Sequence, residues 1–485
     1  MAKPQPNLEE LPEEIILHIL RMVHDTPIPD FHLRKWGYQD DSWFEYDQST
    51  RDIQNVRLTS RSLSRIGSEL LIEYVGLDLS LESLTRFQTI MAHPGIRKGV
   101  GMIRIRLPAY QWHLCVEEMT YEKKKLDVGR IAICLGPEGE TPASLCSGWR
   151  DCPQTPDEVK AAIEQSRREY RKRFQAQQRF LKDPQDFLQG VSNALKMSNN
   201  KAIRVEFTDM NDLPQQFRFR QSVERAEVEN HLDLLLRAPL SPRPWCVSAY
   251  DDGNEPEFHQ GLAPLILHIL AAFADERINI VSLKLRISSV NSSDRKVLGK
   301  MESELGPVRG ACTAMRNLRR FKYLNMESTN PLLASEGGTH RELSTLLYRC
   351  LPPSLRVLEL WGPTDLDWLR CRLPSLTQIT LDSLEVRAEG LEPMLRWLQP
   401  HETDITLRRC HNEIATWDAI LDLLRSKQRN TRLIQPSGLE FGLAQQTGRF
   451  SSLYSPEERA NRIRVSEQYI RGDLDTNPFR PTRKS

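Results

Sequence analysis

The sequence predicts an α/β protein in which a small all-helical module precedes a long array of short parallel strands that alternate with helices. Three observations support this prediction. Apolar residues recur at helical spacing over 11–23 and 52–75. Short stretches with apolar residues at alternate positions follow between residues 75 and 410, and helical stretches separate most of them. Because alternating strands and helices are joined by crossovers, the strands should be parallel and the crossovers right-handed.

Composition favours a folded protein of several domains. The chain has 485 residues, of which 39% are hydrophobic and 27% are charged. This length accommodates roughly two to four domains. The formal net charge of +1 gives no global field that would draw nucleic acid or an anionic membrane, so neither is expected as a partner.

The expected location is the cytoplasm or the nucleus. The polar start MAKPQPNLEE does not resemble a signal peptide, and no run of about 18 apolar residues predicts a transmembrane helix. The nine cysteines are odd in number and scattered, without a CxxC pair or zinc spacing. This pattern favours free thiols in a reducing compartment.

The stretch LPEEIILHIL, residues 11–20, predicts a short amphipathic helix. Pro12 suits the first helical turn, and Glu13 and Glu14 then lie at the positive end of the helix dipole. A helix this short is marginal by itself, so its apolar side chains must be buried against a neighbour. The apolar positions are Ile15, Ile16, Ile19, Leu20 and Val23.

Two further short helices are expected in residues 52–75. Ile53 and Val56 mark the first, and Thr59 or Ser60 is the expected N-cap of the second. Together the helices predict a module over residues 8–76. This is below the size at which a single core is comfortably stable, so the module would gain from a partner chain. The second helix is marked by Leu63, Ile66, Leu70, Leu71 and Tyr74.

An insert over residues 25–51 separates the opening helix from the other two. It contains six aromatic and six acidic residues but only three lysines and arginines. One interpretation is a mobile loop laid partly over the module. The other is a recognition loop whose aromatic side chains anchor a partner.

The module resembles an F-box. LPEEIILHIL is similar to the family's opening Leu-Pro-x-Glu-Ile/Leu-Leu, and NVRLTSRSLSRIGSELL is similar to its second half. The resemblance implies a three-helix fold that docks on a Skp-type adaptor and through it on a cullin ubiquitin ligase. The family normally joins its halves by a few residues, and the long insert departs from that pattern. The positions that match the module core or the adaptor contact are Leu11, Pro12, Ile15, Ile16, Ile19, Val56, Leu58, Leu63 and Ile66.

The later strands follow a Leu-x-x-Leu-x-Leu pattern, as at 280–285, 355–360 and 376–381. They resemble the irregular leucine-rich repeats that follow many fungal F-boxes, although the spacing is uneven and the usual asparagine is missing. The resemblance implies a solenoid of parallel strands over residues 183–428, preceded by a first repeat-like unit at 77–107. The alternative is an ordinary α/β domain with a mixed sheet. The expected strands are 75–79, 102–107, 202–207, 278–287, 318–326, 355–362, 376–384 and 404–410.

Two segments do not fit the array. Residues 108–182 are expected to form an irregular insertion that ends in a charged helix at 159–182. The basic residues of that helix form either a phosphate- or acid-binding face or a solvated surface. Residues 429–485 are charged and lose the pattern, with a local helix expected at 456–470 and disorder near the end.

Alternate residues of the later strands are expected to point to one exposed face, because successive side chains of a strand alternate between faces. This face is basic in its middle, which suits an acidic or phosphorylated protein segment held by charge-assisted hydrogen bonds. The alternative is a charged surface that only keeps the chain in solution. The candidate residues are Lys284, Arg286, Arg320, Lys322, Glu359, Trp361, Thr380, Asp382 and Arg408.

The sequence contains no short motif of a P-loop, a nucleophile elbow, an HExxH zinc site or a calcium loop. We therefore expect no enzyme activity, no metal and no cofactor.

The predicted function is substrate recognition in a Skp–cullin–F-box ubiquitin ligase, in which the module binds the adaptor and the array binds a protein target. One alternative is a non-catalytic scaffold whose F-box-like module serves folding or another partner. The other is an enzyme with catalytic groups from distant positions.

Overall fold

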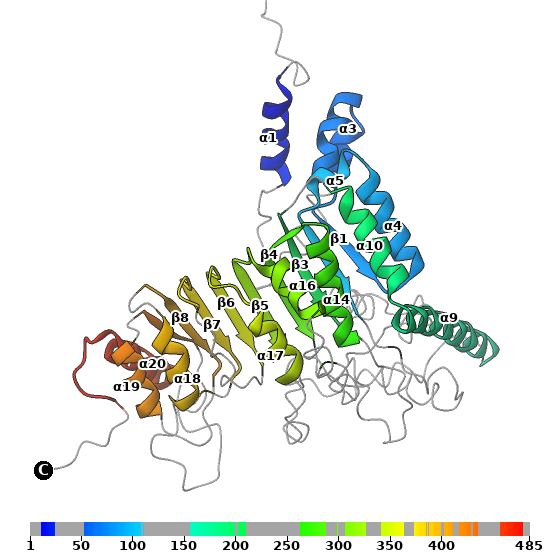
Figure 1. The fold of residues 1–485 in the computed structure, drawn as a ribbon. Coiled ribbons are helices and arrows are strands. Elements are labelled where there is room, and N and C mark those ends of the chain that lie inside the picture. Colours follow the sequence, from blue (N-terminus) through cyan, green and yellow to red (C-terminus); the bar gives the residue numbers. More distant parts are fainter. Residues whose placement is uncertain are drawn as a thin grey trace, which may run out of the picture. The chain divides into compact units, whose positions relative to one another are not determined.

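The computed structural model has an α/β architecture. In the part of the chain that the structure describes, nine strands form one sheet in the order β1-β2-β3-β4-β5-β6-β7-β8-β9, so that sequence neighbours are also sheet neighbours (Figure 1). Residues 1–203 with 210–243 make one compact unit, and residues 204–209 with 244–485 make the other. The described residues are 11–24, 53–107, 110, 156–198, 202–209, 262–287, 298, 306–325, 341–362, 373–384, 386, 388–398, 402–410, 417–427, 430–434 and 456–478.

Several expected features lie outside the described residues. They include the insert at 25–51, nearly all of the irregular insertion up to residue 155, and residues 435–455 and 479–485 of the tail. Both interpretations of the 25–51 insert therefore stay predictions. Within the described ranges, no helix combines the length and the apolar character needed to cross a bilayer.

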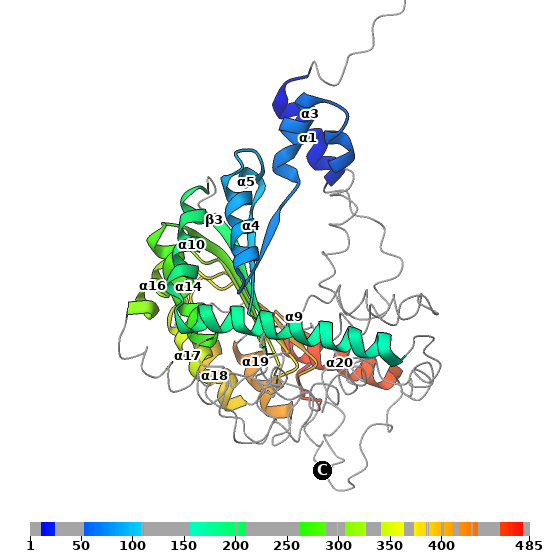
Figure 2. The ribbon, with the colours of Figure 1, turned by 90° about the vertical axis from the view of Figure 1, so that its right-hand side faces the viewer.

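The N-terminal helices of the first unit share a small apolar cluster. α1 packs against α3, as Figure 2 also shows. Ser60 is the N-cap of α3, because its side-chain oxygen accepts a hydrogen bond from the Leu63 amide nitrogen at 3.1 Å. The elements are α1 (Glu13–His24), a helix at 53–57, α3 (Arg61–Gly67) and η3 (Ser68–Leu70). The buried residues of the cluster are Ile16, Leu20, Ile53, Leu63 and Ile66, and Leu11, Leu17, Val56, Leu70 and Leu71 pack around them.

These helices belong to the same compact unit as the first strands. η3 packs against α5 (Ile96–Gly99), and the two backbones approach closely. A β-carbon at Gly99 would lie only 1.6 Å from the carbonyl oxygen of Glu69, so this position requires glycine. Within the helical cluster, Glu69 is linked to α1, because its Oε1 lies 2.9 Å from Arg21 Nη2. The helical cluster is thus joined to the strand-bearing part by packing as well as by the chain.

The remainder of the first unit places two helices side by side. β1 and β2 pair in parallel with Tyr74 opposite Met102. α4 and α10 are in contact, and Gln88 Nε2 donates a hydrogen bond to the Gly190 carbonyl at 3.3 Å. The expected charged helix is present as α9, which Figure 2 shows as one long helix. The bounds are β1 (Tyr74–Asp78), α4 (Leu81–Ala92), β2 (Met102–Arg106), α9 (Pro156–Lys182) and α10 (Gln185–Lys196).

The second unit is a run of parallel strands and crossover helices. The neighbouring strands from β4 to β9 all pair in parallel. The expected strands correspond to β1–β8, and the mixed-sheet alternative is wrong for these pairs. The bounds are β3 (Ala202–Thr208), α14 (Leu262–Asp275), β4 (Asn279–Ile287), α16 (Gly306–Met315), β5 (Arg320–Asn325), α17 (Arg341–Arg349), β6 (Val357–Trp361), β7 (Gln378–Asp382), α18 (Ala388–Trp397), β8 (Asp404–Arg408), α19 (Trp417–Lys427), β9 (Thr431–Ile434) and α20 (Pro456–Arg471).

Two buried apolar rows run across these strands and set their register. A shift of one residue would expose every one of these side chains, so the apolar pattern specifies the pairing strongly. The side chains between the rows lie on the opposite face, which we call the open face. The first row is Leu283, Phe321, Leu358, Ile379 and Ile405, and the second is Leu285, Tyr323, Leu360, Leu381, Leu407 and Leu433.

Candidate protein-binding surfaces

The strand register places the nine predicted face residues in three rows on the open face. Arg320 lies between Ser282 and Val357 in the row nearest the strand starts. The middle row contains Lys284, Lys322, Glu359 and Thr380, and the row at the strand ends contains Arg286, Leu324, Trp361, Asp382 and Arg408. Residues from five strands, distant in sequence, are therefore direct neighbours on one surface.

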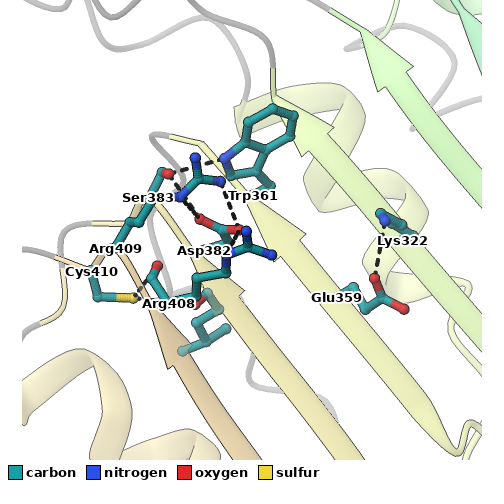
Figure 3. Close-up of polar contacts among 9 residues, drawn as sticks. Lys322, Glu359, Trp361, Asp382, Ser383, Arg408, Arg409 and Cys410 are labelled. Carbon is teal, nitrogen blue, oxygen red and sulfur yellow. Dashed lines mark hydrogen bonds and ion pairs between the residues drawn. The ribbon is translucent and has the colours of Figure 1, made fainter. Parts of the chain in front are cut away.

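Carboxylates flank a like-charge pair in the middle row. Lys284 and Lys322 are direct cross-strand partners, which by itself is destabilising. Glu206 Oε1 lies 3.4 Å from Lys284 Nζ. Figure 3 shows the second pair, in which Glu359 Oε2 lies 3.2 Å from Lys322 Nζ. Arg320 Nε lies 3.8 Å from the other oxygen of Glu359. Each lysine thus has a carboxylate on its outer side, and the positive charge is greatest between β4 and β5.

A second polar cluster, the Asp382 corner, consists of Trp361, Asp382, Ser383, Arg408 and Arg409 (Figure 3). Arg409 donates to both oxygens of Asp382 at 2.9 Å, and Arg408 Nε lies 3.5 Å from one of them. Ser383 Oγ donates to Asp382 at 2.9 Å and accepts from Trp361 Nε1 at 3.0 Å. The Arg409 guanidinium lies 5.6 Å from the centroid of the Trp361 ring, within the range of a cation–π contact.

A repeated backbone turn builds this corner. Gly362, Ser383 and Arg409 each follow the last residue of a strand, and their φ angles are 89°, 56° and 49°. Their amides donate to the carbonyls of Asp382, Arg408 and Ile434 at 3.0, 2.9 and 2.8 Å. The same left-handed turn thus recurs at the ends of β6, β7 and β8, linking each turn to the next strand.

Cys410 adds a further link between neighbouring turns. Its thiol donates to the Leu381 carbonyl at 3.3 Å, and the side chain is fully buried. Burial raises the pKa of Cys410 to about 12, so the thiol stays protonated at neutral pH. Cys410 is therefore a structural donor rather than a nucleophile. The thiol stabilises the turn through its hydrogen bond to the Leu381 carbonyl.

The predicted F-box positions divide into a buried group and an exposed group. Ile16, Leu63 and Ile66 are buried in the cluster, and Leu11 and Val56 pack partly against it. The side chains of Pro12, Ile15 and Leu58 are exposed, and Ile19 is half-buried. The predicted motif positions therefore include both core residues and surface residues.

The exposed group forms part of an apolar stripe on α1. Ile15, Ile19 and Met22 follow one another at i, i+4 and i+7, so they lie on one side of the helix. Ile15 is 47% exposed and Met22 is 61% exposed, whereas Ile16 and Leu20 are buried in the cluster. We call Ile15, Ile19 and Met22 the α1 stripe. Met22 is not among the motif positions predicted from the sequence, although its position seven residues after Ile15 was the available signal.

The polar edge of α1 is tied to α3. Both terminal nitrogens of Arg65 donate hydrogen bonds to the carboxylate of Glu13. The bond from Nη1 to Oε2 is 2.9 Å long. This hydrogen bonding lowers the pKa of Glu13, although the pair lies at the surface. Because exposed pairs contribute little stability, the pair mainly orients α1 on α3.

In the part of the chain that the structure describes, no group of three or more histidine, cysteine, aspartate or glutamate side chains is arranged to hold a metal ion. No protein-family model matches the chain, and no curated protein matches it in sequence comparison. The two surfaces are therefore characterised by their own geometry alone.

Proposed function

We propose that this chain is the substrate-recognition subunit of a Skp–cullin–F-box ubiquitin ligase. In this proposal the helices of residues 11–71 dock on a Skp-type adaptor, and the open face of β4–β8 binds a protein target. The observation that carries the proposal is the α1 stripe, an apolar surface on a helix whose other apolar side is already buried. The sequence that forms this helix is also the part that resembles an F-box.

The α1 stripe has the chemistry of a docking surface. Burying one large aliphatic side chain contributes roughly 1.5–3 kcal/mol. A partner that covers the stripe gains this binding free energy for each side chain that it buries. Leu58, at the end of the helix at 53–57, is 85% exposed and adds to the apolar surface of these helices. Adjacent exposed apolar residues such as those of the α1 stripe are typical of protein–protein interaction sites.

The open face supports the second half of the proposal. Its nine predicted residues include five cations and two carboxylates, so the surface retains a basic excess after internal pairing. A protein segment with acidic side chains complements this excess. Its carboxylates would take the place of the internal carboxylates as partners of these lysines and arginines. The repeated register and the repeated left-handed turn favour a leucine-rich-repeat-like solenoid, in which such a face is a common binding surface.

The proposed role is non-enzymatic. The chain would hold its target close to a conjugating enzyme carried by the cullin complex, and so raise the effective concentration of the target. The chemistry of transfer would belong to that enzyme. Specificity would come from the open face alone.

The first experiment measures adaptor binding by the full chain. The wild-type protein, Ile15→Asp and Met22→Asp are co-expressed with a Skp-type adaptor and affinity-purified. Loss of a central apolar contact costs about 2 kcal/mol or more, so we expect each variant to bind at least about tenfold more weakly. Leu81→Asp is the matched control, because Leu81 is 69% exposed but lies on α4, outside the α1 stripe.

Circular dichroism establishes that the variants fold, which their exposed positions favour. Wild-type binding that neither stripe variant weakens contradicts the docking surface. Absence of wild-type binding favours the scaffold alternative, in which the helices serve folding. The close packing of Gly99 on Glu69 is the observation that supports this second candidate.

A further inference from the structure

Two thiols on adjacent crossover helices are in direct contact. Cys312 lies on α16, and Cys350 immediately follows α17, 38 residues later. Their Sγ atoms are 2.6 Å apart, and the two helices pack against each other. The strand β5 lies between them in sequence, so the contact joins two successive crossovers of the second unit.

The two thiols have different surroundings, and this difference decides which of them reacts first with an oxidant. Cys312 is partly exposed, whereas Cys350 is only 4% exposed. The hydrogen bond with Cys350 lowers the pKa of Cys312, and the same contact together with burial raises the pKa of Cys350. Cys312 is therefore the thiol that ionises first and that a small oxidant can reach.

We propose that Cys312 and Cys350 are a redox site at which a hydroperoxide drives formation of a reversible intramolecular disulfide. The Cys312 thiolate attacks one peroxide oxygen, the O–O bond breaks, and the hydroxide that leaves takes a proton to become water. The sulfur of Cys350 then attacks the resulting sulfenic sulfur, the S–O bond breaks, and the departing hydroxide takes the thiol proton of Cys350. In total, two thiols and one hydrogen peroxide give one disulfide and two waters.

The crosslink has a defined structural effect. It closes a loop over residues 312–350, which contains β5, a strand of the open face, and α17. A crosslink over a loop of this size stabilises chiefly by restricting the unfolded chain. Oxidation is therefore expected to raise the melting temperature of the second unit, and a dithiol reductant reverses the change.

Mass spectrometry of the full chain tests the site, because trypsin isolates each thiol. Cleavage after arginine releases residues 310–316, GACTAMR, and residues 350–356, CLPPSLR, each with one cysteine. Native protein is exposed to hydrogen peroxide, alkylated and digested. We expect the two peptides to appear joined, and to separate after dithiothreitol. The peptide that begins at Cys410 is the internal control and should stay unlinked, since this thiol is buried and its pKa is raised.

Matched variants assign the linkage. Cys312→Ser should abolish the joined peptide completely, whereas Cys410→Ser should leave its yield unchanged. Wild-type protein whose two peptides stay separate, or in which Cys312 is oxidised to the sulfinic acid without joining Cys350, overturns the proposal. The measurement uses no adaptor, so its outcome is independent of the proposed ligase function.

Discussion

At the scale of single residues, Asp382 organises the ends of three strands. One carboxylate accepts from Arg409 through two hydrogen bonds, lies near Arg408, and accepts from Ser383. Its side chain is only 13% exposed, so solvent screens these interactions weakly. Two guanidinium groups next to each other are stable here because this carboxylate lies between them.

Replacement of Asp382 by asparagine should destabilise the second unit. The amide keeps the shape but loses the charge that the two arginines share. Hydrogen bonds to charged groups contribute about 1.5–3 kcal/mol, and we expect a loss in the free energy of unfolding of that order. Urea denaturation followed by tryptophan fluorescence measures it, since Trp361 lies in the same corner. Asp404→Asn is the control, because Asp404 is exposed at the start of β8; an equal loss in both variants contradicts the assignment.

Neighbouring isoleucines on α1 should respond differently to the same truncation. Ile16 is 1% exposed in the apolar cluster, whereas Ile15 is 47% exposed. Truncation of a buried isoleucine to alanine costs about 2–5 kcal/mol, so Ile16→Ala should lower the unfolding free energy of the first unit by this amount. Ile15→Ala should change it by no more than about 0.5 kcal/mol. Chemical denaturation of both variants, monitored by circular dichroism, gives the comparison; equal losses would show that the two sides of α1 are not distinct.

At the scale of elements, the left-handed turn after β6, β7 and β8 is the repeated unit of the second half of the chain. Glycine adopts positive φ without strain, but Ser383 and Arg409 do not share this freedom. Their side chains make hydrogen bonds in the Asp382 corner that offset the strain. The turn therefore positions the side chains of the Asp382 corner, and the hydrogen bonds of the corner in return stabilise the strained backbone of the turn.

Two glycine-to-alanine changes separate backbone strain from side-chain packing. Gly362 has a φ of 89°, whereas Gly306 begins α16, where an added β-carbon would meet no other atom within 4 Å. Alanine at position 362 should destabilise by about 1 kcal/mol or more, since its native conformation is incompatible with a β-carbon. Alanine at position 306 should be neutral or slightly stabilising. Thermal unfolding of the two variants tests this, and equal effects would show that the turn is not under conformational constraint.

At the scale of the whole molecule, the protein presents two surfaces of different chemistry. The α1 stripe in the first unit is apolar, and the open face of the second unit is charged with a basic excess. An apolar surface favours a durable complex, whereas a charged surface favours rapid and salt-sensitive recognition. Under the function proposed above, the apolar surface would hold the adaptor and the charged surface would exchange targets.

The basic excess predicts salt-sensitive binding of an acidic peptide. A fluorescein-labelled glutamate-rich peptide should bind the full chain, and binding should weaken as ionic strength rises. Arg286→Glu combined with Arg320→Glu should weaken it by about tenfold, equivalent to about 1.4 kcal/mol. Fluorescence anisotropy measures the affinity. Arg396→Glu combined with Lys427→Glu makes the same change in net charge on α18 and α19 and should have little effect. Equal losses would indicate a general field rather than a site.

The sequence by itself determined the strands, because side-chain alternation is local. The Leu-x-x-Leu-x-Leu runs placed β4, β6 and β7 within two residues of their ends, and alternation correctly assigned Lys322 and Glu359 to one face. The amphipathic pattern at 11–23 likewise predicted α1. These features depend only on neighbours along the chain, so one sequence contains the information.

Short elements and contacts between distant segments were decided by the tertiary structure. β9 has four residues and no leucine pattern, and it exists as a strand because β8 offers it a hydrogen-bonding edge. α16 contains two glycines and a proline, yet Gly310 allows it to pack closely on Ala271 of α14. The Asp382 corner and the Cys312–Cys350 contact join residues 22 to 48 positions apart. Such contacts arise only when the register brings successive turns together, because their free energy comes from neighbours in space.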